Sequence, residues 1–144
     1  MICGYGEAEA LIREKQKSDA RIVYLGRVDR KQVLALQRRA AVLVNPRQNN
    51  EEFTKYSFPS KNLEYLSSGV PVIACKLDGI PDEYDDYLMY PADDRIETLT
   101  ELLQRVCRMS AQERDMLGEK GRRFVLDEKN ATAQTRKILN LFGA

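Results

Sequence analysis

The chain has 144 residues, the usual size of one domain. Its 23 basic and 22 acidic residues give a net charge of +1, which excludes a general electrostatic attraction to nucleic acid or to a membrane surface. There is no histidine, so Ser-His and Cys-His nucleophile pairs are excluded and the commonest metal ligand is missing. Cys3, Cys75 and Cys107 form no Cys-x-x-Cys pair, which indicates reduced cytosolic thiols rather than a zinc site or a disulfide framework.

Short apolar runs alternate with helical patterns over the first two thirds of the chain. The runs rich in Val, Ile and Tyr are predicted strands, at 21–25, 41–45, 70–74 and 88–90. Between them, apolar residues recur at helical spacing in three segments, 7–16, 29–40 and 61–68, the second capped by Asp29. This alternation predicts an α/β fold, a Rossmann-like, doubly wound parallel sheet with helices on both faces. Ile2 and Cys3 look like the stump of a further strand, so we expect a sheet that is truncated at its N-terminal side.

The last third of the chain is predicted to be helical. One apolar stripe is formed by Ile96, Leu99, Leu102, Leu103 and Val106. Ser110 and Glu113 have the spacing of a capping box, which opens the next helix, and Asn130 caps the last one. No repeat, linker or low-complexity segment divides the chain, so residues 1–144 are predicted to be a single domain.

The most informative segment follows the second predicted strand. Ligands of open parallel sheets bind beyond the carboxyl ends of the strands. Pro59 suits the first turn of a helix, and the amides near Ser60 and Lys61 then point outward, where phosphate binds. Ser60 and Glu64 are four residues apart and share a helix face. Amides and a lysine for phosphate, with one carboxylate for vicinal hydroxyls, suit a nucleoside diphosphate.

The same residues have a simpler interpretation. Ser60 would only cap the helix, Lys61 would be solvated, and Glu64 would pair with a neighbouring base. The residues alone leave both interpretations open.

A family resemblance bears on this choice. The run from Phe58 to Ala74, FPSKNLEYLSSGVPVIA, resembles the donor-site signature of retaining GT-B glycosyltransferases of family 4. The flanking segments resemble the family in the same order: 21–26 the strand whose loop frames the base, 78–82 the Gly-Gly-x-Pro-Glu turn, and 90–94 the segment that opens the C-terminal helices. The variant Phe-Pro-Ser-Lys is most similar to enzymes that build bacterial surface or capsular polysaccharides.

The resemblance implies that residues 1–144 are the C-terminal, nucleotide-sugar-binding domain of a GT-B enzyme, without its acceptor-binding domain. The implied reaction transfers a sugar from a UDP- or GDP-sugar to an acceptor hydroxyl, with retention and without a metal or other cofactor. The sugar or lipid-linked acceptor would be held by the missing domain. The expected location is the bacterial cytoplasm, or the periphery of the inner membrane through that domain.

The resemblance also implies roles for single residues. Glu64 would hold the ribose hydroxyls, and Pro59, Ser60 and Lys61 would form the diphosphate site. The base would be framed by Gly26, Arg27 and Val28. Gly4 and Gly6 match a glycine pair near the donor, although a tight turn with positive φ explains glycine there equally well.

The sequence departs from the family in two places. Tyr56 stands where the first glutamate of the family's Glu-x7-Glu pair would contact the donor sugar, and Glu51 or Glu52 is a candidate substitute. The Arg and Lys that neutralise the diphosphate in the family would precede Met1. We therefore expect that the chain alone transfers no sugar, and that the unpaired edges of a truncated sheet favour self-association.

Two further functions stay open at this point. A nucleotide-sugar epimerase with a GT-B-like fold would depend on histidine and carboxylate pairs, and the chain has no histidine. A non-catalytic nucleotide-binding or assembly module is favoured by Tyr56. A P-loop NTPase and a receiver-like signalling domain are disfavoured, because the chain lacks the Gly-Lys phosphate loop and an acidic cluster after the first strand.

Overall fold

A computed structural model describes residues 1–48 and 52–143 of the chain. These residues contain six α-helices and a three-stranded parallel sheet, which confirms the predicted α/β class. The chain divides into two compact units, Met1–Leu36 and Gln37–Ala144. A search of the described residues finds no helix with the length and apolar surface that spanning a bilayer requires.

The smaller unit contains α1 (Glu9–Ser18) and the first seven residues of α2 (Arg30–Arg38). The prediction of a strand at 21–25 is wrong: the segment forms only an isolated parallel bridge, between Tyr24 and Ile2. A strand needs a partner segment of several residues to pair with. Here the partner is Ile2 alone, which donates its N–H to Val23 O (2.8 Å) and accepts the Leu25 N–H at its carbonyl (3.0 Å). The predicted cap of α2 is confirmed, because the Asp29 carboxylate accepts the Gln32 N–H at 2.8 Å.

The sheet lies in the larger unit, in the order β1 (Leu43–Asn45), β2 (Val72–Ala74) and β3 (Leu88–Met89). All pairs are parallel, and the register aligns Val44 with Ile73 and Ile73 with Met89. The strands predicted at 41–45, 70–74 and 88–90 are thus confirmed in type and order, but each is shorter than predicted. At the start of β2, Pro71 has no N–H to donate, and only its carbonyl joins the pairing, accepting the Leu43 N–H at 2.9 Å.

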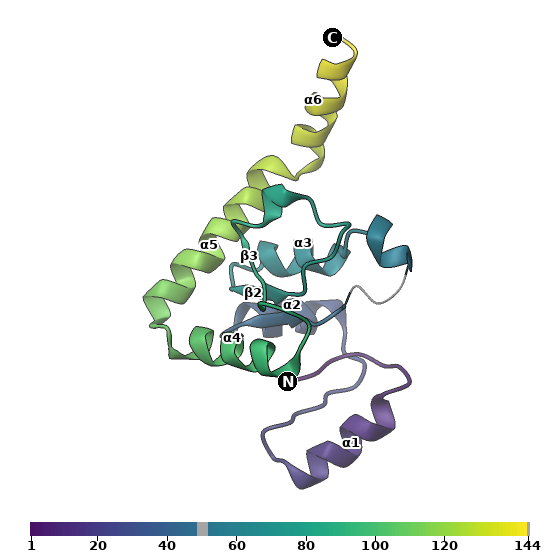
Figure 1. Cartoon of the computed structure of the whole chain (residues 1–144), viewed down its shortest axis with the longest axis vertical. Helices are drawn as coiled ribbons and strands as arrows, with labels where there is room; N and C mark the ends of the chain where they lie inside the picture. The colour runs from purple at the N-terminus through teal and green to yellow at the C-terminus, as the bar shows by residue number, and fades with distance from the viewer. Residues whose placement is uncertain (49–51, 144) are drawn as a thin grey trace. The chain divides into compact units, whose positions relative to one another are not determined.

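Helices cover both faces of this sheet, as predicted (Figure 1). On one face, Val72 and Leu88 pack with Leu66 of α3 (Ser60–Ser67) and Phe124 of α5 (Ala111–Glu128). On the other face, Ile73 packs with Leu102 and Val106 of α4 (Ile96–Arg108). The two sets come from successive strand positions, whose side chains point to opposite faces.

The C-terminal helices agree with the sequence analysis in most respects. Ser110 and Glu113 form the predicted capping box at the start of α5, and the Asn130 side chain caps α6 (Ala131–Leu141). Ile96 is an exception in the predicted apolar stripe, because it is the first residue of α4 and is 78% exposed. In Figure 1, α6 extends away from the sheet beyond the end of α5.

Candidate functional site

The candidate site is built on the N-terminus of α3. Pro59 is the residue before the first helical position, Ser60, and not part of the first turn as the sequence predicted. Its backbone is extended, with φ −69° and ψ 103°, and its carbonyl accepts the Asn62 N–H at 2.8 Å. The N-cap residue, Pro59, makes no side-chain cap bond, and Ser60 is already the first helical residue, so Ser60 does not have the capping role of the simpler interpretation. Ser60 and Lys61 are both exposed.

A buried amide pair fixes this helix end beside the sheet. Asn45, the last residue of β1, donates a hydrogen bond from Nδ2 to Oδ1 of Asn62 at 2.8 Å. Asn62 is fully buried in the first turn of α3. The N-terminus of α3 therefore lies at the carboxyl end of β1, the edge where ligands of parallel sheets bind.

The loops after β1 and β2 meet at the same edge. Arg47, two residues beyond β1, donates from Nη2 to the Ser57 hydroxyl at 3.2 Å. Gly79, in the turn after β2, lies so close to Ser57 that a Cβ at Gly79 would be 2.7 Å from the Ser57 carbonyl oxygen. Glycine at 79 is therefore required by the close approach of two loop backbones. The hydrogen bond to Ser57 also places Arg47 at this edge as a second cation, which the sequence analysis did not identify.

Lys76 is a third cation beyond a strand end, but acidic partners hold it. Its ammonium group pairs with Asp85 and with Asp82, the latter at 3.3 Å, and lies 5.3 Å from the centre of the Tyr90 ring. Desolvation alone would lower the pKa of Lys76, but the hydrogen bonds to Asp85 and Asp82 outweigh it and raise that pKa. Lys76 therefore stays charged, and the carboxylates of Asp82 and Asp85 offset its charge.

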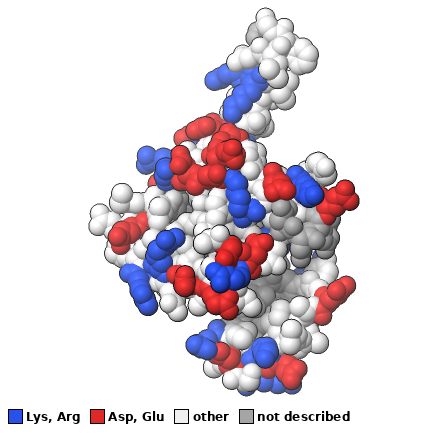
Figure 2. All heavy atoms as spheres, viewed as in Figure 1, with Lys and Arg blue, Asp and Glu red and all other residues white. Residues whose placement is uncertain are grey.

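The charges of the larger unit show no extended basic surface on the face in Figure 2. Lys and Arg side chains are interspersed there with Asp and Glu, in keeping with the net charge of +1. Phosphate recognition at the carboxyl edge would therefore depend on single cations and on the helix N-terminus rather than on a broad positive field.

Glu64 lies one turn into α3. Its side chain is half-buried, whereas Leu66 on the sheet-facing side is 2% exposed. The carboxylate oxygen Oε1 accepts a hydrogen bond from Nε2 of Gln37, at 2.6 Å. Sequence reasoning missed Gln37. The available signal was its position among Val33, Leu36 and Ala40, where a polar residue interrupts the face predicted to be apolar.

The candidate sugar contacts are less well placed. Tyr56, the last residue of the short 3₁₀ helix η1 (Glu52–Tyr56), is 84% exposed, and Glu52 at its start is also exposed. Glu51 lies outside the described residues. Because the Tyr56 side chain is so exposed, packing does not explain why a tyrosine stands at this position. Neither Tyr56 nor Glu52 is held in place by burial.

The remaining predicted residues, Gly4, Gly6, Gly26, Arg27 and Val28, all lie in the smaller unit. Gly4 donates its N–H to the Gly26 carbonyl at 2.8 Å, and the Arg27 guanidinium lies 5.1 Å from the centre of the Tyr5 ring. Gly4 and Gly26 have φ of +134° and +64°, so tight turns explain glycine at both positions. Gly6 has no such φ, and Val28 is half-buried.

A family model described as glycosyl transferases group 1 matches residues 1–109, which include the whole sheet, α3 and the turn after β2. The chain belongs to this family. The resemblance seen in the sequence is thereby confirmed, together with a glycosyltransferase fold of the Rossmann-like α/β type. A search of curated proteins finds no match.

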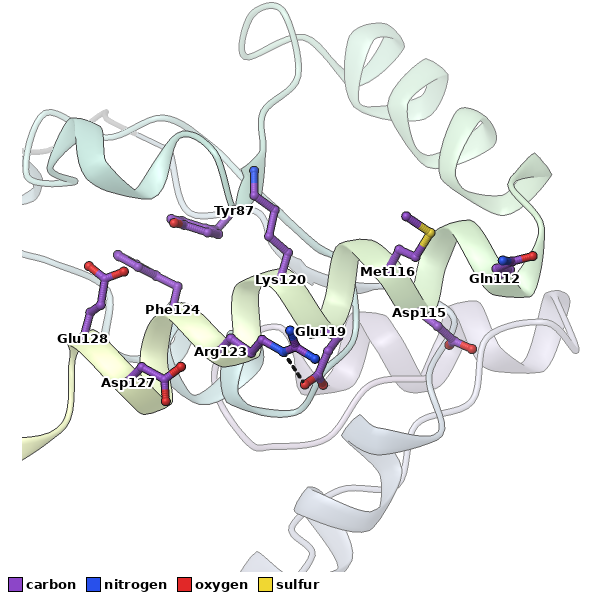
Figure 3. Close-up of a pocket in the computed structure, with 10 residues that line it drawn as sticks. All are labelled: Tyr87, Gln112, Asp115, Met116, Glu119, Lys120, Arg123, Phe124, Asp127 and Glu128. Carbon is purple, nitrogen blue, oxygen red and sulfur yellow. Dashed lines mark hydrogen bonds and ion pairs between the residues drawn. The ribbon is translucent and has the colours of Figure 1, made fainter.

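A cavity in the described part of the chain lies away from this edge. It has a volume of about 780 Å³ and runs along α5, beyond the residues that the family model matches (Figure 3). Tyr87 and Phe124 stack at its floor with ring centres 4.0 Å apart, and Glu119 pairs with Arg123 at 3.1 Å. Tyr87 precedes β3 and thus stands at the amino end of that strand. Lys61 and Glu64 lie at the carboxyl edge and are not among the residues that line this cavity.

Proposed function

We propose that this glycosyltransferase chain binds a nucleotide-sugar donor, linked to UDP or GDP, at the carboxyl edge of its sheet. It would be the donor-binding part of a retaining enzyme that acts in bacterial surface polysaccharide synthesis, in the cytoplasm or at the inner membrane. The observation that carries the proposal is the N-terminus of α3. Its N-cap residue, Pro59, makes no side-chain cap bond, and the Asn45–Asn62 bond holds this helix end at the end of β1.

The diphosphate would bind at this helix end. Backbone N–H groups at a helix N-terminus and the helix dipole attract anions, and phosphate most of all. Lys61 is in the first turn, and Arg47 is held at the same edge through Ser57. These groups would offset the charge of a diphosphate, so we expect binding that does not depend on a metal ion.

The ribose would bind at Glu64. A carboxylate can accept hydrogen bonds from two vicinal hydroxyl groups, and Glu64 is one turn away from the proposed phosphate position. The loop that contains Gly26, Arg27 and Val28 would frame the base, and Tyr56 and Glu52 would face the sugar. The acceptor, a sugar or a lipid-linked sugar, would be held by a further domain.

Replacing Glu64 by alanine tests the proposal. We expect the affinity for UDP or GDP to fall about 10- to 100-fold, the size of a lost hydrogen bond to a charged group. Isothermal titration calorimetry with both nucleotides, with and without EDTA, measures the change. Glu101→Ala on α4 is a matched control that removes an exposed carboxylate elsewhere. Equal affinity in a folded Glu64→Ala variant would exclude Glu64 as the ribose ligand.

A non-catalytic nucleotide-binding module is the second candidate. Tyr56 favours it, since this residue stands where the family resemblance expects a sugar-contacting glutamate. Such a module would bind nucleoside diphosphates as well as nucleotide-sugars and would transfer nothing in the full-length protein.

Self-association is a further prediction about partners. The strands β1 and β3 are the outer strands of the sheet, and unpaired strand edges favour pairing with another chain. We expect the mass measured by light scattering to rise with protein concentration. A constant monomer mass over the accessible range would contradict this.

A further inference from the structure

Gln37 is a polar side chain at a position where an apolar one is expected. It lies in the last turn of α2, four residues after Val33 and three before Ala40, and it is 6% exposed. Its Nε2 donates to Glu64 Oε1 at 2.6 Å, across 27 positions of sequence. Its Oε1 is buried and has no hydrogen-bond partner among the described residues.

Stability does not account for this residue. A buried carbonyl oxygen without a donor destabilises a fold, and an apolar side chain of the same length would avoid that cost. Of the two polar atoms of the Gln37 amide, Nε2 has a hydrogen-bond partner among the described residues and Oε1 has none, and the partner of Nε2 is Glu64. The contact with that carboxylate is therefore what Gln37 contributes.

We propose that Gln37 is the positioning residue for the ribose-binding carboxylate of Glu64. This inference rests on the proposed function, which makes Glu64 the ligand of the ribose hydroxyls. A glutamate side chain has three rotatable bonds, and ordering them on ligand binding costs conformational entropy. The hydrogen bond from Gln37 holds one carboxylate oxygen in place before the ligand arrives, so less of that entropy is lost on binding.

The chemistry of the amide suits this role. A primary amide donates a hydrogen bond to a carboxylate without adding a charge and without exchanging a proton at neutral pH. Because its own carbonyl oxygen is buried, Gln37 acts through Glu64 and does not itself contact the nucleotide. The substrate class that it favours is consequently a ribonucleotide with both hydroxyl groups present.

The test compares ribose selectivity in the Gln37→Met variant, which keeps the length of the side chain and removes the donor. Calorimetry on the full chain uses UDP and GDP together with their 2′,3′-dideoxy counterparts. We expect Gln37→Met to weaken binding of the ribonucleotide up to about 10-fold, the cost of ordering the Glu64 side chain on binding, with no change for the dideoxy compound. Gln32→Met, an exposed glutamine on the same helix, is the matched control and should change neither affinity.

The double variant Gln37→Met/Glu64→Ala separates positioning from a general effect. If Gln37 acts through Glu64, the double variant binds the ribonucleotide no more weakly than Glu64→Ala alone. Should Gln37→Met fold poorly, Gln37→Leu also removes the donor without adding a charge and is expected to give the same selective loss.

The outcomes distinguish failure of the role of Gln37 from failure of the proposed function. Loss of ribose selectivity in Glu64→Ala but not in Gln37→Met or Gln37→Leu would overturn the role of Gln37 and leave the proposed function intact. Equal weakening of ribo and dideoxy compounds by either Gln37 variant would also overturn it, since that shows general damage. Failure of the unaltered chain to prefer the ribonucleotide would overturn the proposed function and this inference together.

Discussion

The Gly118→Ala variant is expected to lose about 3 kcal/mol of its free energy of unfolding, a large part of the stability of an ordinary domain. A Cβ at this position of α5 would lie 2.0 Å from the carbonyl oxygen of Gly69 and 2.8 Å from the Val70 nitrogen. Those atoms are backbone, so no side-chain rotation relieves the clash. Either α5 moves away from the end of α3, or the segment leading into β2 shifts.

A thermal melt followed by circular dichroism measures the effect, and we expect the midpoint to fall by about 10 °C. Gly6→Ala is the control, because a Cβ at Gly6 would meet no heavy atom within 4 Å and the φ of this residue is not positive. That variant should melt within about 2 °C of the unaltered chain. A Gly118→Ala variant that melts like the control would show that α5 does not pack on residues 69 and 70.

This contact matters for the site as well as for stability. Gly69 follows α3 with φ of +77° and donates its N–H to the Leu66 carbonyl at 3.2 Å, which ends the helix. The other end of the same helix is held by the Asn45–Asn62 bond. The helix that carries Glu64 is thus fixed at both ends, and loosening it at Gly69 should also weaken nucleotide binding.

Features specified by neighbouring residues could be predicted from the sequence. In the capping box, Ser110 accepts the Glu113 N–H at 3.2 Å and Glu113 accepts the Ser110 N–H at 2.7 Å. Both bonds span three residues, so the local sequence determines them. Long periodic segments such as α4 were predictable for the same reason. The segment 21–25 has the composition of a strand, but strand formation depends on a partner elsewhere in the chain, and only Ile2 pairs with it among the described residues.

The candidate site could be predicted only in part. The spacing of Ser60, Lys61 and Glu64 on one helix is a local property, and the helix begins at Ser60. The partner of Glu64 is not local, because Gln37 lies on another helix and only the fold brings the two together. The same holds for Arg47, whose contact with Ser57 spans a loop of ten positions. Sequence spacing thus predicts which groups would face a ligand, whereas the groups that contact them are known only from tertiary structure.

The 144-residue chain by itself is expected to transfer no sugar to any acceptor. Transfer needs donor and acceptor in one attack geometry, and such positioning supplies several kcal/mol of the barrier. The described groups of the candidate site, namely Arg47, Lys61 and Glu64, all come from one edge of one sheet. In the proposed function they would hold the donor, and the acceptor would be held by a further domain.

Incubating the chain with UDP- and GDP-sugars and a panel of lipid-linked and oligosaccharide acceptors tests this expectation, with product detected by mass spectrometry. Slow hydrolysis of the donor is the most that we expect, and Glu64→Ala should reduce it because that variant binds the donor less well. A full-length protein that joins this chain to an acceptor-binding domain should transfer sugar under the same conditions. Robust transfer by the 144 residues alone, abolished in Glu64→Ala, would show that one sheet edge holds both substrates and that the chain is a complete enzyme.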